Sequence, residues 1–310
     1  MQYPILLIGF NRPDLIRSRL SEILGQIESH VLLYVYVDGS RGIRDSESNL
    51  EIRNLALEYS QRQNVEFIFR DHNLGCSRNI ITAVTEVCEV HPGAIVVEDD
   101  VSLSPEFVSV VSSILDKWNT ESDWLTVGGF SPFVIKNNWI AKMLNRWRKS
   151  DYFSAWGWGI RAEAWNEFSV VNSRDLLERR LQTSKKWQDL GKRKQEIWIR
   201  RFDRNIWDFQ VQMTHFAIDK FCLLPTFRLI DNQGFGSELS THTRHKRPWN
   251  FFGSGYSIRA PEIPNNLSSN KPRSFWRFLD ANLWAADGHF NSRARTVGLR
   301  SLIKKLLKLN

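Results

Sequence analysis

Residues 94–105 read AIVVEDDVSLSP, and they supply both the first fold hypothesis and the first chemical one. The four apolar residues at the start of this stretch predict a short buried strand. Three consecutive carboxylates follow it, Glu98, Asp99 and Asp100, and the residues at 104–106 have the pattern of a helix start. Ligands bind at the carboxyl ends of strands in open α/β sheets, so we expect the acidic triplet to lie in a binding site.

The triplet has the chemistry of a cation site. Neighbouring carboxylates repel one another unless a positive group lies among them, and hard cations such as Mg²⁺ and Mn²⁺ prefer oxygen ligands from carboxylates and phosphates. The sequence therefore indicates a site for a divalent metal and a phosphate group. A solvated acidic loop that caps the following helix is the alternative interpretation.

Composition places the chain among globular proteins with an unusual second half. Of its 310 residues, 42% are apolar and 25% are charged, as is ordinary for a soluble protein. Its 13 tryptophans fall mostly after residue 123, where they provide flat surfaces for ring-shaped ligands or large core side chains. Three cysteines without CxxC spacing argue against a disulfide framework or a zinc site. Because no stretch has the pattern of a signal peptide or a membrane span, we expect a cytoplasmic protein.

The net charge of +8 is concentrated near the C-terminal end. Residues 271–310 contain nine Lys or Arg and two Asp, which indicates an anionic partner, either a membrane or a nucleic acid. Apolar residues of this tail have helical spacing with basic residues between them, at Leu299, Leu302, Ile303, Leu306 and Leu307. We therefore expect a basic amphipathic helix on the inner face of the cell membrane, and no nucleic-acid partner. A helix packed on protein is the alternative.

Strands and helices alternate in the first half of the chain. Apolar runs predict strands at residues 4–10, 31–37, 65–69 and 95–97, and helical spacing predicts helices at 14–27, 48–62 and 77–90. This alternation is typical of an α/β fold with a doubly wound, mostly parallel sheet. No GxGxxG or GxxxxGK[ST] motif is present, so neither a dinucleotide fold nor a P-loop is indicated.

A polar turn follows each of these strands. The turns contain Arg12, Asp38, Asn73 with Gly75, and the acidic triplet. In a parallel sheet the four turns gather along one edge, so a basic residue, an acid able to bind a base, a glycine loop and metal-type acids would share one cleft. That arrangement is the outline of a nucleotide-diphosphate site.

The second half of the chain has a different pattern. Further strands are expected at 123–130 and 223–230, and helices at 162–170, 174–204 and 207–219. The helix at 174–204 is strongly basic. We expect the polar segment at 134–151 to be mobile, and residues 244–273 to form an extended wrap.

Taken in order, these motifs resemble the GT-A family of nucleotide-sugar glycosyltransferases, in particular N-acetylglucosaminyltransferase I and related bacterial enzymes. The resemblance runs over residues 4–242 and is carried by Phe10-Asn11-Arg12, Val37-Asp38, Glu98-Asp99-Asp100 before Ser104-Pro105-Glu106-Phe107, Ala155-Trp156-Gly157-Trp158 before Arg161-Ala162-Glu163-Ala164-Trp165, and Trp207-Asp208. An acidic triplet alone is weak evidence, but the triplet followed by Gly-Trp and Trp-Asp elements is specific. The C-terminal tail has no counterpart in the family, and the basic segment at 175–204 is longer than the family requires.

The resemblance implies a nucleotide-sugar donor and a role for each strand-end residue. Arg12 and Asp38 would hold the nucleobase, with uracil expected, Asp99 the ribose and Glu98 the sugar hydroxyls, while Asn73 and Gly75 would line the donor loop. The alternative role for Arg12 is phosphate binding or a contact at the start of the following helix. Asp38 is also explained by turn chemistry, since Asp-Gly is a common turn dipeptide.

The metal and the sugar floor are implied in the same way. Asp100 would ligate Mn²⁺ or Mg²⁺, and His242 is a candidate further ligand or diphosphate contact, although a lone histidine is often structural. Trp156, Gly157 and Trp158 would form the floor beneath the donor sugar or the acceptor. Core packing is the alternative for these tryptophans, and it is favoured most for one of the two.

Asp208 is the candidate general base. Inverting sugar transfer needs one carboxylate to take the proton of the acceptor hydroxyl while a metal stabilises the departing diphosphate. A helix N-cap is the alternative role for Asp208, because Asp favours that position and a helix is expected to begin nearby. The two roles are compatible.

We therefore expect an inverting, divalent-metal-dependent glycosyltransferase of the hexosyl or N-acetylhexosaminyl type. It would move a sugar from a UDP-sugar to a glycan or lipid-linked acceptor in polysaccharide biosynthesis. Residues 1–125 would bind the nucleotide-sugar, residues 126–243 would form the acceptor and catalytic half, and residues 244–310 the wrap and basic tail. A sugar-phosphate nucleotidyltransferase is the first alternative, although residues 9–13 lack the glycine-rich, basic loop usual there. A non-catalytic carbohydrate-binding protein is the second.

Overall fold

The computed structural model describes residues 3–171, 173–234, 255–257, 259–264, 267, 276–277 and 280. His242 and the amphipathic tail at 299–308 lie outside the described residues, as does most of the expected wrap at 244–273.

The first half of the chain forms the predicted parallel sheet. Its strands are β1 (Ile5–Gly9), β2 (Leu33–Val37), β3 (Val65–Phe69) and β4 (Gly93–Glu98), and they lie side by side in the order β3-β2-β1-β4. All three pairings are parallel. The connecting helices are α1 (Pro13–Leu24), α2 (Ser46–Glu58), which follows the short helix η1 (Ile43–Asp45), and α3 (Cys76–Val90).

The second half continues the same sheet beyond β4. The added strands, in spatial order, are β8 (Trp158–Arg161), β6 (Trp124–Gly128), β9 (Phe221–Pro225) and β7 (Trp147–Ser150). β8 and β7 run antiparallel to their neighbours, so the other six strands of this eight-stranded sheet share one direction. The prediction of a mostly parallel Rossmann-like sheet is therefore confirmed.

Helices cover both faces of the sheet, because alternate strand residues point to opposite sides. One core joins the sheet to α1, α2 and α4 (Phe107–Leu115). The other joins it to α3, α6 (Ala162–Val171) and α10 (Trp207–Ala217). No described helix has the length and apolar character needed to cross a membrane.

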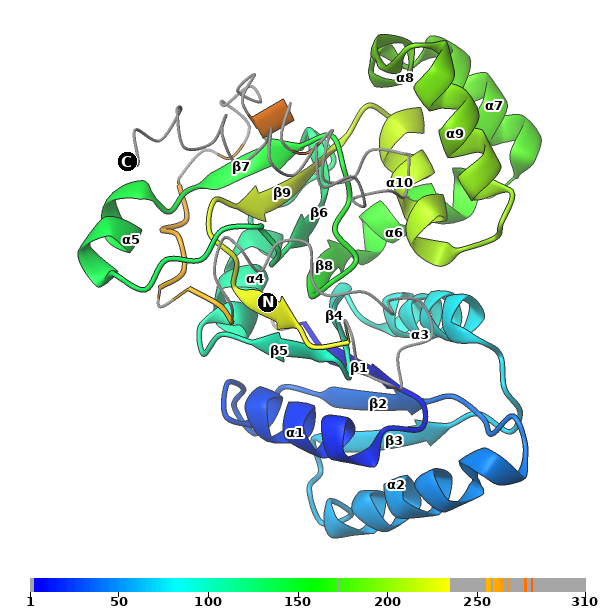
Figure 1. The fold of residues 1–310 in the computed structure, drawn as a ribbon, viewed down its shortest axis with the longest axis vertical. Coiled ribbons are helices and arrows are strands. Elements are labelled where there is room, and N and C mark those ends of the chain that lie inside the picture. The colour runs from blue at the N-terminus through cyan, green and yellow to red at the C-terminus, as the bar shows by residue number, and fades with distance from the viewer. Residues whose placement is uncertain are drawn as a thin grey trace, which may run out of the picture.

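The expected helix at 174–204 is instead three helices. They are α7 (Arg174–Thr183), α8 (Lys185–Leu190) and α9 (Lys192–Phe202), and they pack as a further layer on α10 (Figure 1). The first break occurs where the Ser184 side chain accepts a hydrogen bond from the Trp187 backbone N–H. The second occurs at Gly191, whose φ of 75° lies in the left-handed region that glycine adopts readily.

The expectation of a mobile segment at 134–151 is wrong. Residues there form α5 (Asn138–Leu144) and the edge strand β7. β7 is buried although it carries charge, and Lys149 Nζ lies 2.5 Å from Asp123 Oδ2. The expected strand at 223–230 is also divided, into β9 and β10 (Ile230–Asn232), and β10 pairs with β5 (Val101–Leu103) in a small antiparallel sheet.

The aromatic core of the second half is centred on Trp158. Its side chain is fully buried, stacked on Trp207 at 5.7 Å between ring centroids and in edge contact with Phe153 at 5.2 Å. Offset-stacked and edge-to-face pairs of this kind add to the free energy gained by burying the rings. Trp158 therefore stabilises the junction between β8 and α10.

We expect Trp158→Ala to lower the free energy of unfolding by about 3–5 kcal/mol, because it leaves a large cavity in the core. Trp139→Ala is the control, since Trp139 is 70% exposed and its loss should change that free energy little. Urea unfolding followed by circular dichroism measures both variants. Equal stability of the two variants would contradict the assignment.

Candidate functional site

The turns after the parallel strands meet at one edge of the sheet, as the sequence predicts. Ile8 of β1 lies in register with Glu98 of β4, and Gly9 with Val37 of β2. The residues that follow these strands therefore begin side by side, with Arg12 and Asp38 near the acidic triplet. Backbone hydrogen bonds extend the pairing one step further, from Asp38 N to Gly9 O and from Asp99 N to Ile8 O, each 3.0 Å.

Arg12 is the positive group among the carboxylates. Its Nε donates to Asp99 Oδ2 at 3.1 Å, its Nη2 pairs with the other Asp99 oxygen, and its Nη1 donates to Asp100 Oδ2 at 3.1 Å. The Asp99 side chain is 2% exposed, whereas Asp100 is 17% and Arg12 18% exposed. Asp99 is therefore held inside by a bidentate ion pair, and Asp100 presents its carboxylate toward the surface.

Asp38 organises the loop after β3. One carboxylate oxygen accepts hydrogen bonds from the backbone N–H groups of Gly39 and Leu74, at 2.9 and 2.8 Å. The other accepts from Asn73 Nδ2 and from the Gly75 N–H, both at 3.0 Å. A carboxylate has about four acceptor positions, so these bonds occupy Asp38 fully. Its observed function is to fix the loop that contains Asn73 and Gly75.

Glu98 lies at the centre of the negative charge. Burial raises the pKa of Glu98 well above the ordinary value of a glutamate, and the carboxylates of Asp100 and Asp99 raise it further. Asp208 raises the pKa of Glu98 as well, while Arg12 acts in the opposite direction. The structure thus brings Asp208, which is distant in sequence, into the electrostatic environment of the acidic triplet.

Asp208 reaches this site because α10 begins there. The Trp207 backbone N–H lies 3.2 Å from Ser77 Oγ, which joins the first turn of α10 to the first turn of α3. The N-cap of α10 is Ile206, so Asp208 is the second residue of the helix and not its cap. One of its oxygens accepts from the Phe209 N–H at 2.9 Å, in the first turn where the helix dipole favours negative charge.

A late segment of the chain closes on Asp100. The Gln233 N–H donates to the Asp100 backbone oxygen at 2.7 Å, directly after β10. A side chain on residue 234 would displace the Asp100 carboxylate from its present position, so Gly234 leaves room for it. Sequence reasoning did not assign this segment to the site, although the polar Asn232-Gln233-Gly234 run after a predicted strand is a usable signal.

The two tryptophans of the expected sugar floor take different positions. Trp158 is in the core, so its side chain cannot contact a ligand at the surface. Trp156 is partly exposed and packs edge-on against Phe130, with ring centroids 4.9 Å apart. Gly157 between them is buried, with a φ of +58° and the side chains of Ile230 and Phe107 beside it. Trp156 is thus the tryptophan of this pair that retains an open surface.

The carboxylates of the acidic triplet are the type of oxygen ligand that a hard divalent cation prefers. Within the described residues, no group of three or more His, Cys, Asp or Glu is arranged to hold a metal ion. Mg²⁺ is commonly bound by one or two carboxylates, with phosphate oxygens and water as the other ligands, so a full protein cage is not required. The partly exposed Asp100 side chain would provide such a ligand, and Arg12 already pairs with it.

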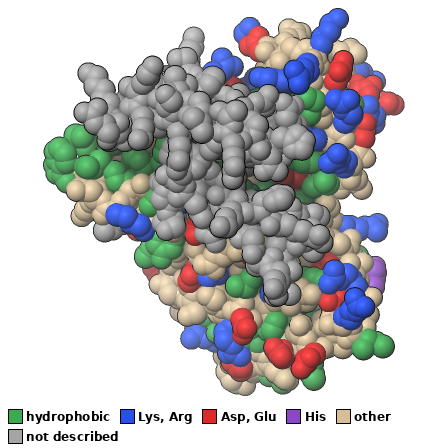
Figure 2. Space-filling view, viewed as in Figure 1, with side chains coloured by type: hydrophobic (Ala, Val, Ile, Leu, Met, Phe, Trp, Pro, Cys, Tyr) green, Lys and Arg blue, Asp and Glu red, His purple; other side chains and the backbone are tan. Residues whose placement is uncertain are grey.

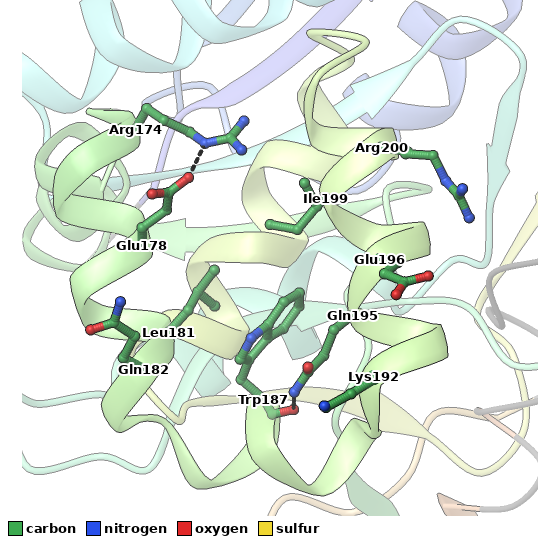
Figure 3. A pocket seen from close by; sticks show the side chains of 10 residues that line it. All are labelled: Arg174, Glu178, Leu181, Gln182, Trp187, Lys192, Gln195, Glu196, Ile199 and Arg200. Atoms are coloured by element: carbon green, nitrogen blue, oxygen red, sulfur yellow. Dashed lines mark hydrogen bonds and ion pairs between the residues drawn. The ribbon is translucent and has the colours of Figure 1, made fainter.

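The helical layer contains a separate cavity of about 610 Å³ (Figure 3). Leu181, Trp187 and Ile199 supply its apolar lining, and Arg174 pairs with Glu178 beside it, with 2.6 Å between Nε and Oε1. All of its lining residues belong to α7, α8 or α9, so it is distinct from the strand-end site.

No family model and no curated protein matches the chain. Solved structures similar to it include GalNAc-T7 with UDP, GalNAc and Mn²⁺, at 9% identity and a TM-score of 0.46 over 72% of this chain and 41% of that one. TarS 1–349 of S. aureus is similar over 72% of this chain and 58% of its own, at 11% identity and a TM-score of 0.41. A UDP-glucose pyrophosphorylase complexed with UDP-glucose is similar over 74% and 91%, at 11% identity and a TM-score of 0.37. Glycosyltransferases are thus among the similar structures, while the fold assignment rests on strand order and register.

Glu98→Gln should raise the free energy of unfolding at pH 7 in buffer with chelator. The raised pKa of Glu98 in the folded protein means that its ionised form is disfavoured there, whereas the unfolded chain ionises it freely. Wild type therefore loses stability as pH rises above the unfolded value of about 4.3, and the variant does not lose this component.

Urea unfolding at pH 4, 5.5 and 7 checks this pH dependence, with exposed Glu89→Gln as the control. The difference between wild type and Glu98→Gln should be smallest at pH 4, where Glu98 is protonated in the folded protein and mostly protonated in the unfolded chain. A difference that is constant with pH, or larger at pH 4, would contradict the environment assigned to Glu98.

Proposed function

We propose that this protein is an inverting, divalent-metal-dependent glycosyltransferase that moves a sugar from a UDP-sugar to a glycan or lipid-linked acceptor. One observation carries the proposal: the strand-end edge of a mostly parallel sheet holds both a partly exposed carboxylate, Asp100, and a second acid, Asp208, from a distant helix. Residues 1–125 would hold the donor, residues 126–243 the acceptor, and residues 244–310 the wrap and tail.

The donor would lie across the turns after β1, β2 and β3. Arg12 is proposed to contact the base or the phosphates, and Asp99, which Arg12 holds, to face the ribose. Asp38 would act on the base through the loop that it fixes, with Asn73 and Gly75 lining the donor. Asp100, with His242 as the proposed further ligand, would hold Mn²⁺ or Mg²⁺, which would stabilise the charge of the departing diphosphate.

Asp208 would take the proton of the acceptor hydroxyl as that oxygen attacks the anomeric carbon. The bond from that carbon to the diphosphate breaks, the proton stays on the Asp208 carboxylate, and the anomeric configuration is inverted. Glu98 would contact sugar hydroxyls, and its raised pKa suits a group that donates a hydrogen bond. Trp156 would offer the stacking surface beside them.

The cellular site is proposed from sequence alone. We propose a cytoplasmic enzyme of polysaccharide biosynthesis, held on the inner face of the cell membrane by the amphipathic tail at 299–308. That tail lies outside the described residues, so its spacing and charge are the support for this proposal.

With Mn²⁺ and a panel of UDP-sugars, wild type should slowly release UDP from one donor in the absence of acceptor. Asp100→Asn keeps the size of the side chain but removes its charge, so UDP release should fall by about 10²-fold or more while the circular dichroism spectrum shows an intact fold. Asp175→Asn on exposed α7 is the control. Pyrophosphate from UTP and a sugar phosphate would instead identify a nucleotidyltransferase, and full activity with chelator would exclude the metal-dependent mechanism.

Asp208→Asn tests the proposed base. Loss of a general base lowers kcat by about 10²- to 10⁴-fold, while the KM of the donor should stay near that of wild type, because Asp208 contacts the acceptor. Asp203→Asn is the matched control, since Asp203 pairs with Arg174 at the surface. Near-normal transfer by Asp208→Asn, or a product that retains the donor's anomeric configuration by NMR, would contradict the mechanism.

A further inference from the structure

Helix α5 exposes three large apolar side chains. Trp139 is 70% exposed, and Met143 and Leu144 are each 48% exposed. Figure 2 shows a hydrophobic patch where Figure 1 places α5, at one side of the molecule. Exposed apolar side chains are common singly, but contiguous ones mark interaction sites.

The orientation of α5 is the reverse of an ordinary surface helix. Trp139 and Met143 are four residues apart and lie on the same side of the helix, with Leu144 next to them. The side turned to the protein contains Ala141, which is 1% exposed. A surface helix normally buries its large apolar side chains and exposes polar ones. In α5 the fully buried residue is small, Ile140 is only partly buried, and the other three large apolar side chains are exposed.

The surroundings of this apolar face are positively charged. Residues 124–150 contain no Asp or Glu, and the exposed residues in and around α5 include Lys136, Lys142 and Arg146. Arg146 also donates to the Lys142 backbone oxygen at 3.0 Å, which places one guanidinium at the end of the helix. Tryptophan and leucine combined with basic residues are typical of segments that lie in the interface of an anionic membrane.

The position of α5 relates this face to the candidate site. α5 follows β6, which has the same direction as β1 and β4, and it precedes β7, which has the opposite direction. It therefore connects strands at the edge of the sheet where Arg12 and the acidic triplet lie. Figure 1 shows α5 beside the start of β7, at the other end of this edge from the turn between β1 and α1.

We propose that α5 inserts Trp139, Met143 and Leu144 into the headgroup region of an anionic bilayer, with Lys142 at the lipid phosphates. This contact holds the protein at a bilayer surface, where a lipid-linked acceptor is available, an inference that rests on the proposed function. A second copy of the chain fits the face less well, because pairing would oppose like charges. Three exposed side chains also fall far short of the ~1,200 Å² typical of a stable protein interface.

The test is sedimentation of the full-length protein with vesicles of phosphatidylcholine, with and without phosphatidylglycerol. Wild type should bind the anionic vesicles, and a variant with Trp139→Ser, Met143→Ser and Leu144→Ser should bind them roughly tenfold or more weakly. The matched control replaces three other exposed apolar residues, Ile43, Leu50 and Leu57, with Ser in η1 and α2. It should bind as wild type does. Brominated lipids should quench tryptophan emission of wild type more than that of Trp139→Phe.

Each outcome is decisive. Binding by the α5 variant equal to wild type, or equal loss in the control, overturns the proposal and leaves the C-terminal tail as the membrane contact. A concentration-dependent dimer that the α5 variant abolishes assigns the face to a second copy and also overturns it. UDP release without acceptor should be unchanged in the variant. If no donor is turned over by wild type, the proposed function fails while the vesicle result stands.

Discussion

The ion pair between Arg12 and the carboxylates of Asp99 and Asp100 is the constraint on which the candidate site depends. Placing three consecutive acids at a strand end, with Asp99 buried, is unfavourable unless positive charge compensates for the water that they lose. Arg12 reaches them because β1 and β4 are paired in register and because the chain turns directly after β1. The strand order, the turn after β1 and the start of α1 thus together place Arg12 beside the carboxylates. A metal or phosphate ligand would bind next to this positive charge.

Asp38 and helix α10 also contribute to this edge of the sheet. Asp38 uses its oxygens to hold the loop at 73–75, so an acid that seems available in the sequence is committed to the protein's own backbone. α10 brings Asp208 to the triplet, together with the positive end of a helix dipole. The charge of the site is therefore balanced by backbone groups as well as by Arg12.

The parallel half of the fold could be predicted because local patterns determine it: apolar runs, helical spacing and a polar turn after each strand. The errors occur where tertiary contacts decide. β7 was missed because Lys149 and its neighbours look like a solvated segment until Asp123 is found beside them. Ser184 and Gly191 divide one basic pattern into separate helices. Strand alternation alone would place Trp156 and Trp158 on the same side. The φ of +58° at Gly157 interrupts the extended segment, and the packing of Trp207 shows that Trp158 is in the core.

The pairing of β5 with β10 has a consequence for the order of assembly. β5 lies next to the triplet, and its partner arrives more than a hundred residues later in the chain. A ribosome releases the first four strands well before residue 233, so a parallel sheet can form while Asp100 lacks its backbone partner. The long separation also makes this contact slow to form, because loop closure must precede it. The part of the binding edge that contacts the Asp100 backbone can therefore form only after synthesis has passed β10.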